Sequence, residues 1–362
     1  FVGNAGFFGA MCGVGYGHEI VLDDCEFTRN YAWGLGGGAA DLDRSTITNC
    51  VFTENRAYAS GGALILSGIS GINHVTNCVF RGNRASWGGA ILCVGHSDVR
   101  DCLFVGNEAA VGGGAGQCIS NPYVTVSNCV LAGNRAGQQG GAWGAREWTS
   151  LEILNCTIAG NRSSRGRALA VDMMKSLNRI AVWNSILSNG GDEIWSSDSP
   201  VEVAYSCISG GAQAIDDPKA WLVWGPGDTD ADPCFADAGY WDPNGTPDDP
   251  NDDFFVEGDY HLKSQAGRWD PNSRGWVEDD VTSPCIDAGD PNSPIGDEPF
   301  PNGGRINMGA YGGTTQASKS YFGEPVSETI IVGDINGDGK VDWLDLDILA
   351  SHWLQTGERA EE

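Results

Sequence analysis

Residues 334–345 read D-I-N-G-D-G-K-V-D-W-L-D and carry the most specific chemical pattern in the chain. Side-chain or main-chain oxygens fall at positions 1, 3, 5, 7, 9 and 12 of this segment, and a glycine occupies position 6. A twelve-residue loop of this kind encloses Ca²⁺, a hard cation that prefers oxygen ligands. The ligands would be Asp334, Asn336, Asp338, Lys340 (through its main-chain oxygen), Asp342 (directly or through water) and Asp345.

The segment after this loop, LDLDILASHWL (344–354), predicts a short helix with apolar contacts at Leu346, Ile348, Leu349 and Leu354. The EF-hand-type loop ends in an aspartate and no clear helix precedes it, so loop and helix resemble one half of a dockerin. A full dockerin carries two such loops and docks onto a cohesin. The resemblance therefore implies a cohesin-like or other surface partner, although this sequence contains a single loop.

The chain has 362 residues and a formal net charge of −27, from 48 acidic and 21 basic side chains. Such a charge repels nucleic acid and anionic membranes and attracts divalent cations. The sequence contains no run of 18 apolar residues, so we predict no membrane-spanning helix. Because it begins with Phe1 inside a repeat, we expect a mature or trimmed secreted product.

A repeat of 24 to 28 residues fills the chain up to about residue 210. Most copies hold Cys-x-Phe or a related triplet, then an Asn, then Gly-Gly-Ala. The Cys column comprises Cys25, Cys50, Cys78, Cys102, Cys129 and Cys156. The Asn column comprises Asn4, Asn30, Asn55, Asn83, Asn107, Asn134, Asn161 and Asn189.

This period predicts an all-β fold, a right-handed parallel β-helix solenoid over residues 1–215. Residues two apart on a strand share one face, so Cys and Phe point inward and the residue between them points away. Stacked coils would form ladders of Cys, of apolar side chains and of Asn, with the Asn amides bonding from coil to coil. An α-solenoid is disfavoured by the 53 glycines and by the lack of a helical apolar stripe.

The C-x-F-x-x-N-x-A…G-G-A pattern resembles the β-helix repeats of bacterial secreted and surface proteins, including polymorphic outer-membrane-protein-like and pectin-lyase-like solenoids. The resemblance covers about residues 1–215 and is specific for the fold. It implies an extracellular or cell-surface location and says little about activity.

The regular Cys column indicates small buried thiols rather than a disulfide framework. Two pairs remain candidates for disulfides. Cys93 and Cys118 follow Gly-Gly-Ala on adjacent coils, whereas Cys234 and Cys285 lie outside the repeat.

Residues 216–320 are rich in Asp, Pro and Gly, and we expect turns, loops and short strands there. SPCIDAGDPNSP (283–294) and PNGGRINMGAYGGT (301–314) resemble a closing module that follows β-helices in bacterial surface proteins, so this loop-rich region would cap the open end of the solenoid. Residues 321–332 would form a linker and 333–362 the dockerin-like module. Further Ca²⁺ ligands or plain turn residues are Asp228, Asp230, Asp232, Asp248, Asp249, Asp252 and Asp253.

Polysaccharide lyases and hydrolases share this fold, so enzyme activity is an alternative, although fold alone implies no chemistry. Arg56, Arg84, Arg135 and Arg162 each follow a ladder Asn. A catalytic site would break the pattern once, so this repeated row favours a structural role. Asp216-Asp217 lies past the last clear coil, and we assign no catalytic residue.

Other candidate residues give weaker signals. Trp33 and Trp87 precede Gly-rich turns, where they would stack on sugars or, in the favoured interpretation, pack at the turn. The histidines lack metal-ligand spacing and are expected at surfaces or turns: His18, His74, His96, His261 and His352.

The sequence as a whole favours a secreted, Ca²⁺-stabilised structural protein of the cell surface or extracellular matrix. Self-assembly into filaments through solenoid ends is the sharper hypothesis, since head-to-tail contacts between identical subunits generate open polymers. The alternative is a polysaccharide-active enzyme or a glycan-binding adhesin built on the same scaffold.

Overall fold

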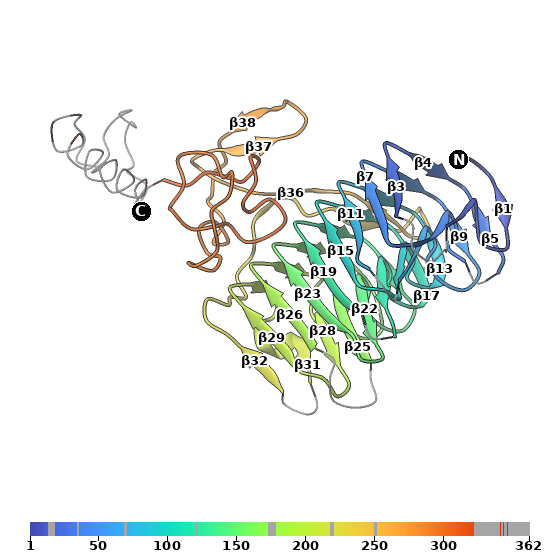
Figure 1. Ribbon diagram of the computed structural model, residues 1–362. Helices are drawn as coiled ribbons and strands as arrows, with labels where there is room; N and C mark the ends of the chain where they lie inside the picture. Colours follow the sequence, from blue (N-terminus) through green and yellow to red (C-terminus); the bar gives the residue numbers. More distant parts are fainter. Residues whose placement is uncertain are drawn as a thin grey trace, which may run out of the picture.

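The computed structural model describes residues 1–13, 19–34, 36–68, 71–120, 122–172, 179–217, 221–249 and 252–321, together with 341, 343 and 346. Its first part is a parallel β-solenoid in which four parallel sheets run along the stack of coils (Figure 1). The predicted all-β solenoid is therefore confirmed. We number the sheets 1 to 4 in the order in which one coil meets them after its Gly-Gly-Ala turn.

The strands of each sheet come from successive coils. Sheet 1 contains β2 (Met11–Gly13), β6 (Ala40–Asp43), β10 (Leu64–Ser67), β14 (Ile91–Cys93), β18 (Gly116–Cys118), β22 (Trp143–Arg146), β25 (Leu169–Asp172), β28 (Ile194–Ser196) and β31 (Ile215–Asp216). Sheet 2 contains β3 (Ile20–Asp23), β7 (Ser45–Thr48), β11 (Asn73–Thr76), β15 (Ser97–Arg100), β19 (Tyr123–Ser127), β23 (Ser150–Leu154), β26 (Arg179–Trp183), β29 (Val201–Ala204) and β32 (Leu222–Trp224).

Sheets 3 and 4 are shorter. Sheet 3 contains β4 (Glu26–Thr28), β8 (Val51–Thr53), β12 (Val79–Arg81), β16 (Leu103–Val105), β20 (Val130–Ala132), β24 (Thr157–Ala159), β27 (Ile186–Ser188) and β30 (Cys207–Ile208). Sheet 4 contains β1 (Ala5–Gly6), β5 (Tyr31–Ala32), β9 (Arg56–Ala57), β13 (Arg84–Trp87), β17 (Glu108–Gly112) and β21 (Arg135–Ala136). A 3-10 helix, η1 (Gly211–Ala214), precedes β31, so coiling continues beyond residue 215.

One coil shows how the sequence produces the turns. The chain passes through β10, β11, β12 and β13 and returns to β14, where Ile91 pairs in register with Leu64. Asn77 and Gly82 occupy the corners on either side of β12 with φ of 53° and 61°. Asn and Gly tolerate this left-handed backbone best, and both recur at these corners in other coils.

A stack of aromatic rings fills the middle of the solenoid. Phe27, Phe52, Phe80 and Phe104 are fully buried, with ring centroids 4.7 to 5.1 Å apart and interplanar angles of 3° to 7°. Isolated aromatic pairs prefer offset or edge-on geometry, so the coil spacing imposes this parallel stack. Trp143 then fills the core edge-on to Phe104, above the space left by Gly116.

The Asn column forms the predicted amide ladder, in which each Asn donates to the Oδ1 of the Asn in the next coil. The main-chain N and side-chain Nδ2 of Asn83 both donate to Oδ1 of Asn107, each at 3.0 Å. Asn107 repeats this with Asn134 and also donates to the carbonyl of Phe80 at 2.9 Å. The polar corner of each coil is thus satisfied by the next coil, although it is buried.

The Cys column forms a second ladder of the same direction. The main-chain N of Cys78 donates to Sγ of Cys102 at 3.4 Å, and the Cys102 thiol in turn donates to the carbonyl of Arg100. The column continues after Cys156 with Ser185 and Ser206. The hydroxyl of Ser185 accepts the main-chain N–H of Cys156, and that of Ser206 accepts the main-chain N–H of Ser185. The thiols therefore act as buried hydrogen-bonding groups, which extends the predicted role of small apolar fillers.

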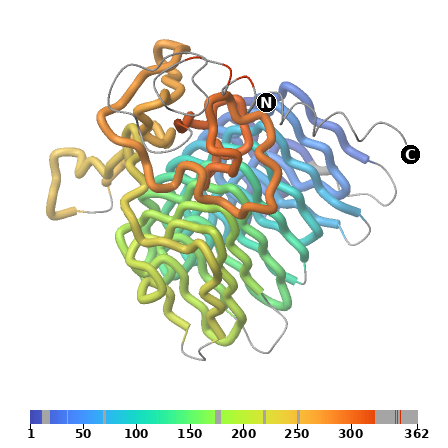
Figure 2. Tube along the Cα trace, turned by 90° about the vertical axis from the view of Figure 1, so that its left-hand side faces the viewer, coloured from blue at the N-terminus to red at the C-terminus, as the bar shows by residue number. Residues whose placement is uncertain are grey.

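Residues 232–321, here called the flanking module, fold back along the outer face of sheet 3 (Figures 1 and 2). Three antiparallel hairpins organise it: β33 (Phe235–Asp237) with β36 (Asp259–Leu262), β34 (Tyr240–Asp242) with β35 (Phe254–Val256), and β37 (Arg268–Asp270) with β38 (Gly275–Val277). We predicted a cap over the open end, but the described contacts lie on the flank of the solenoid.

One feature of the repeat indicates this docking in the sequence itself. The residue between Cys and Phe in each repeat points outward, as predicted, yet it is apolar in most coils. Val130 and Ile186 are buried at this position beneath Tyr260, Leu262 and Met308 of the module. A solvent-facing strand would carry polar residues there, so the apolar outer row of sheet 3 indicates a covered face.

The β34–β35 hairpin is held by a slot between two coils. Phe255 lies over Gly133 and Gly160, where an added Cβ would lie 2.0 and 2.7 Å from its ring atoms. The indole of Trp241 donates to the carbonyl of Gly160 at 2.6 Å. Glycine thus serves both the left-handed corner and the docking of the hairpin at these coils.

The candidate disulfide pairs are placed differently from one another. Cys93 and Cys118 are register partners on β14 and β18, both buried and present as thiols. Cys118 accepts the indole N–H of Trp143 at 3.0 Å. Cys285 shares a buried apolar cluster with Cys207 of the solenoid, whereas Cys234 is half-buried and lies outside that cluster.

Replacing an interior ladder amide should destabilise the solenoid strongly. Asn107→Ala removes the acceptor of both Asn83 donors and leaves buried groups unpaired, which should lower the free energy of unfolding by about 3 kcal/mol. Asn4→Ala is the matched control, because Asn4 is exposed and, within the described residues, accepts no bond from another ladder Asn. Urea denaturation followed by circular dichroism measures the stability of both variants. Equal midpoints for the two would refute the stabilising role of the interior ladder.

Candidate functional site

Both ladders end on a carboxylate at the last coils. Asn189 closes the Asn column by donating its main-chain N and its Nδ2 to the two oxygens of Glu193, at 2.7 and 2.6 Å. Gly191 adds a third N–H at 3.2 Å. Glu193 is fully buried, and burial raises the pKa of its carboxyl to about 7 despite these donors.

Asp228 ends the Cys column in the same way. Its carboxylate accepts the main-chain N–H of Ser206 at 2.9 Å and that of Gly225 at 3.0 Å. Burial raises the pKa of Asp228 to about 6. Asp228 was a candidate Ca²⁺ ligand, but its oxygens here complete a structural ladder. A terminal carboxylate suits this place because the ladders present only N–H groups to their last coil.

An exposed row of arginines runs across sheet 4. In-register pairing joins Tyr31, Arg56, Arg84, Glu108 and Arg135, and an isolated bridge adds Arg162. The predicted row therefore exists and faces outward. A groove of about 300 Å³ lies along its first half, lined by Tyr31, Arg56, Tyr58, Arg84 and Glu108, with alanines and Ser86 between them.

The charges of this groove are only partly compensated. Glu108 lies 3.4 Å from Arg84 and 3.2 Å from Arg135, both across the surface, where such pairs contribute little stability. Within the described residues, Arg56 has no ion pair. Guanidinium groups present planar pairs of N–H donors that match carboxylates and sulfates, and the neighbouring tyrosines offer flat apolar faces.

The flanking module closes the far end of the row. Arg162 pairs with Asp253 at 2.6 Å and lies over the ring of Trp241, with its Cζ 4.3 Å from the centroid. A carboxylate and an aromatic ring of the module thus bind this arginine together. An arginine of the row therefore binds a carboxylate and an aromatic ring together in this structure.

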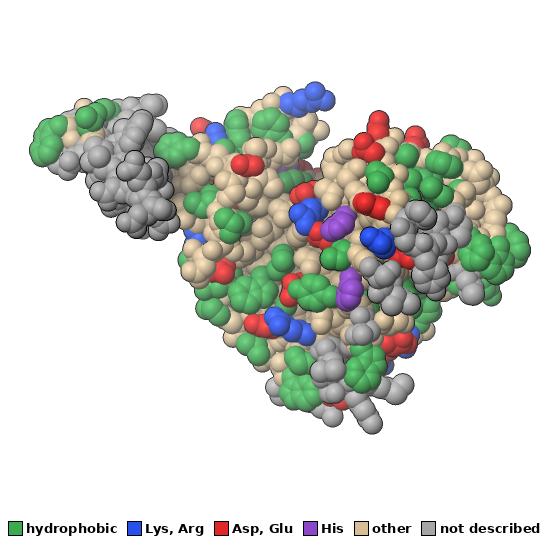
Figure 3. Space-filling view, viewed as in Figure 1, with side chains coloured by type: hydrophobic (Ala, Val, Ile, Leu, Met, Phe, Trp, Pro, Cys, Tyr) green, Lys and Arg blue, Asp and Glu red, His purple; other side chains and the backbone are tan. Residues whose placement is uncertain are grey.

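The outer face of sheet 2 differs from this row. Figure 3 views it and shows acidic and basic side chains interspersed among uncharged atoms. Asp98 pairs there with both His74 and Arg100, and Arg179 pairs with Glu202 at 2.9 Å. Sheet 4 therefore carries the more one-signed charge of the two faces.

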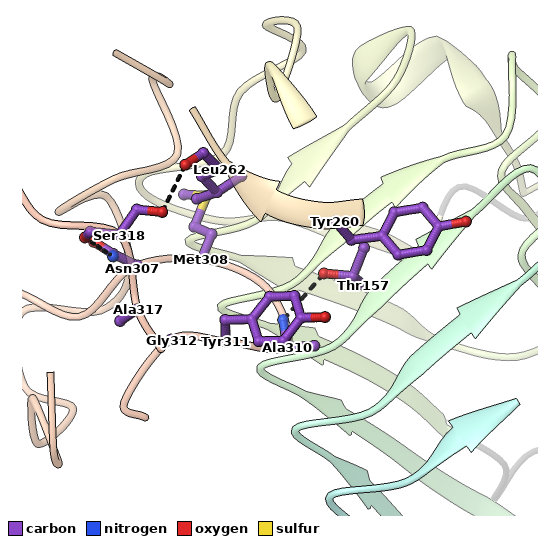
Figure 4. A pocket seen from close by; sticks show the side chains of 10 residues that line it. All are labelled: Thr157, Tyr260, Leu262, Asn307, Met308, Ala310, Tyr311, Gly312, Ala317 and Ser318. Atoms are coloured by element: carbon purple, nitrogen blue, oxygen red, sulfur yellow. Dashed lines mark hydrogen bonds between the residues drawn. The ribbon is translucent and has the colours of Figure 1, made fainter. Parts of the chain in front are cut away.

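The contact between module and solenoid is tightly packed around Thr157 of β24. The cavity at this contact measures about 10 Å³, the room of a single water, between Thr157 of β24 and Tyr260, Met308 and Tyr311 of the module (Figure 4). Thr157 Oγ1 accepts the N–H of Ala310 at 3.0 Å. Around Thr157 the contact is therefore a packed interface, whereas a pocket of about 290 Å³ lies elsewhere along it, between Trp183 of β26 and Ser293 and Ile306 of the module.

The module contains a buried charge network that the sequence did not reveal. His261 on β36 is only 2% exposed, with Nδ1 against Asp259 and Nε2 3.1 Å from Gln316. Arg268 joins Asp259 and Asp279 at 3.1 and 3.0 Å. We expected His261 at a surface or turn, and this was wrong. The alternation Asp-Tyr-His-Leu, polar and apolar in turn, was the available strand signal.

The remaining predicted residues are distributed as follows. Trp87 packs at its turn beneath Arg146, as favoured, whereas Trp33 is exposed and contacts Phe7 edge-on. Asp252 accepts the hydroxyl of Thr246 in the exposed hairpin. The predicted Ca²⁺ ligands, Asp334 to Asp345, lie outside the described residues, which there include only Val341, Trp343 and Leu346.

Within the described residues, no group of three or more His, Cys, Asp or Glu is arranged to hold a metal ion. The helices of that part of the chain also include none with the length and apolarity needed to cross a membrane.

Two family models match parts of the chain. The Chlamydia polymorphic membrane protein repeat matches residues 77–94, the coil from Asn77 to the end of β14. The model described as disaggregatase related matches residues 228–289, from the end of the Cys ladder into the flanking module. No curated protein and no solved structure matches. Together with the geometry, these findings define the chain as a parallel β-solenoid repeat protein with a repeat similar to that of a membrane-protein family.

Glu193 should make stability depend on pH. A carboxyl with a pKa of about 7 when folded and 4.5 otherwise binds more protons in the folded state between these values, so stability falls as pH rises through this window. The difference corresponds to about 3 kcal/mol.

The variant Glu193→Gln has no such titration, but its amide N–H₂ opposes Nδ2 of Asn189. We expect it to be less stable than wild type at pH 5 and to lose less stability than wild type between pH 5 and pH 8. Urea midpoints at both pH values measure this, and parallel losses in the two proteins would contradict the assignment.

Proposed function

We propose that this chain is a secreted, Ca²⁺-stabilised structural protein of the cell surface or extracellular matrix. The observation that carries the proposal is the pair of ladders that run through the solenoid and end on Glu193 and Asp228. They hold each coil to the next by side-chain bonds in addition to the strand pairing, which suits a stiff rod. The match to a Chlamydia polymorphic membrane protein repeat supports the cell-surface location.

The proposal includes assembly of the rods end to end. After β32 the chain leaves the axis and folds along sheet 3, so β31 and β32 are the last strands of their sheets in the described residues. A strand with a free edge can pair with the edge of another chain. A second copy of this protein, or a cohesin-like surface protein held by residues 333–362, is the proposed partner.

Ca²⁺ is assigned in this proposal to the loop 334–345. Its ligand pattern rests on the sequence alone, with Asp334, Asn336, Asp338, Lys340, Asp342 and Asp345 as the ligands. Binding would order the segment that follows the flanking module, since such loops gain their structure from the ion.

Electron microscopy of the purified full chain tests the assembly. We expect ordered filaments with Ca²⁺ that dissolve on chelation, and no filaments from Asp338→Ala, which removes a central ligand. Asp248→Asn is the control, because Asp248 lies in an exposed turn of the module and should leave the Ca²⁺ response unchanged. Short single rods with and without Ca²⁺ would refute assembly, and a Ca²⁺ response lost in Asp248→Asn but kept in Asp338→Ala would move the site to the acidic turns.

A second candidate function is binding of an acidic polysaccharide along sheet 4. The row of arginines and tyrosines supports it, because it stands out in a chain of net charge −27. Successive coils are about 4.8 Å apart, close to the length of one sugar in an extended chain. The segment similar to the disaggregatase-related family reaches this row through Asp253 and Trp241. Whether the bound polymer would also be cleaved is a separate part of this candidate function.

Affinity electrophoresis through gels containing pectate, alginate or uncharged dextran tests this binding. Wild type should be retarded by the acidic polymers, and the double variant Arg56→Ala, Arg84→Ala should lose most of this retardation. Arg179→Ala is the matched control, since Arg179 is a half-exposed arginine on sheet 2. Equal retardation of both variants would assign the binding to net charge or to another face, and retardation by dextran would exclude a requirement for acidic groups.

A further inference from the structure

Two cysteines meet where the flanking module leaves the last strand of sheet 3. Cys207 begins β30 and points away from the solenoid core, beside the inward-facing Ser206 of the Cys ladder. Cys285 belongs to the turn after β38 in the module. Their residues are 1% and 0% exposed and share one apolar cluster with Ile186, Phe235 and Met308.

Hydrogen bonds fix both cysteines on the same short segment, residues 231–234. The Cys207 thiol donates to the carbonyl of Ala231 at 3.1 Å. Two residues on, the carbonyl of Pro233 accepts the hydroxyl of Ser283 at 2.7 Å, and the same hydroxyl accepts the main-chain N–H of Cys285 at 3.1 Å. Both cysteines are thus tied to this one segment and lie in the same apolar cluster.

A second chain of hydrogen bonds links Cys285, through Met308 and Gly309 of the module, to the solenoid. Its carbonyl accepts the N–H of Met308 at 2.9 Å, and the next residue, Gly309, donates to the carbonyl of Asn184 at 2.8 Å. Asn184 directly precedes Ser185, whose carbonyl accepts the N–H of Cys207 at 2.8 Å. A closed circuit of short bonds thus joins Cys207 and Cys285 through solenoid and module.

We propose that Cys207 and Cys285 form a disulfide that fastens the flanking module to the solenoid. The bond forms by exchange with an oxidised small-molecule disulfide such as oxidised glutathione. One cysteine thiolate attacks that disulfide and releases one glutathione thiolate; the second cysteine thiolate then attacks the mixed disulfide and releases the other. Two cysteine thiols are oxidised, two protons are lost to the buffer thiolates and two glutathione thiols result.

The ladder cysteines and Cys234 are less suited to such a bond. Four thiols of the Cys ladder, those of Cys50, Cys78, Cys102 and Cys129, accept an N–H from the preceding coil and donate to carbonyls. A disulfide there would leave buried N–H and C=O groups unpaired. Cys234 is half-exposed and donates its thiol to the carbonyl of Asp232 within its own turn. The Cys207 thiol, by contrast, donates to the carbonyl of Ala231 and accepts no main-chain N–H among the hydrogen bonds of the described residues.

The thiols are unreactive once the module is in place. The hydrogen bond to Cys285 and then burial raise the pKa of Cys207 far above that of a free thiol. The exchange therefore belongs to folding, before the contact closes, and the finished bond is shielded from reductants. It would close a long loop that contains the β34–β35 hairpin, which restricts the unfolded chain.

Cleavage of the chain between the two cysteines tests the bond. A protease recognition site inserted between Asn244 and Gly245 lies in an exposed turn where an added Cβ at Gly245 would meet no atom within 4 Å. The full-length protein is refolded in a glutathione redox buffer at pH 8 and cut at this site, and its free thiols are then alkylated in denaturant. On denaturing gels without reductant the two fragments should stay joined, and with reductant they should separate.

Variants identify the cysteines involved. Cys207→Ser should separate the fragments without reductant, whereas Cys234→Ser should leave them joined. Peptide mapping of the non-reduced wild-type digest gives a second readout that needs no variant, and it should show Cys207 linked to Cys285. Alkylated Cys207 and Cys285 in the folded wild type, or a dominant Cys234–Cys285 link, would overturn the proposal.

Discussion

The structure depends on one constraint: every polar group at a buried corner of a coil must find its partner in the adjacent coil. Strand pairing satisfies the straight segments, but the corners turn the main chain away from that pattern. The Asn and Cys columns supply the missing acceptors, each column at its own corner. Because the bonds between ladder residues run from the N–H groups of one coil to the acceptor of the next coil, the final N–H groups need an acceptor beyond the last ladder residue. Glu193 and Asp228 fill that requirement.

The flanking module obeys a different rule, that of apolar burial. Sheet 3 presents apolar residues outward over the coils where the module lies, and glycines at Gly133 and Gly160 make room for Phe255. Polar contacts such as Arg162 with Asp253 then fix its position. The solenoid is therefore both a rod and a platform, and its four faces have become chemically different although they derive from one repeat.

The sequence predicted the solenoid, its ladders and the outward arginine row because each follows from a fixed period and from the two-residue alternation of strands. It did not predict the flank docking, the carboxylate ends of the ladders or the buried His261 network. The flank docking joins residues far apart in the chain, and each of the three features occurs once, so no repetition marks them. Two local signals existed in retrospect, namely the apolar residue between Cys and Phe and the alternation around His261. Asp228 was a candidate cation ligand or turn residue, because an Asp-rich turn and a ladder end share the same local sequence.

The direction of the ladder bonds also determines where coils can be gained or lost during evolution. Any interior coil offers acceptors to the coil before it and donors to the coil after it, so a duplicated or deleted coil leaves a valid joint on both sides. The coils that carry Gly133, Gly160 and the terminal carboxylates lack this freedom, because each has a unique partner. Duplication of a coil is thus tolerated in the first half of the rod and is not tolerated in the half beneath the module.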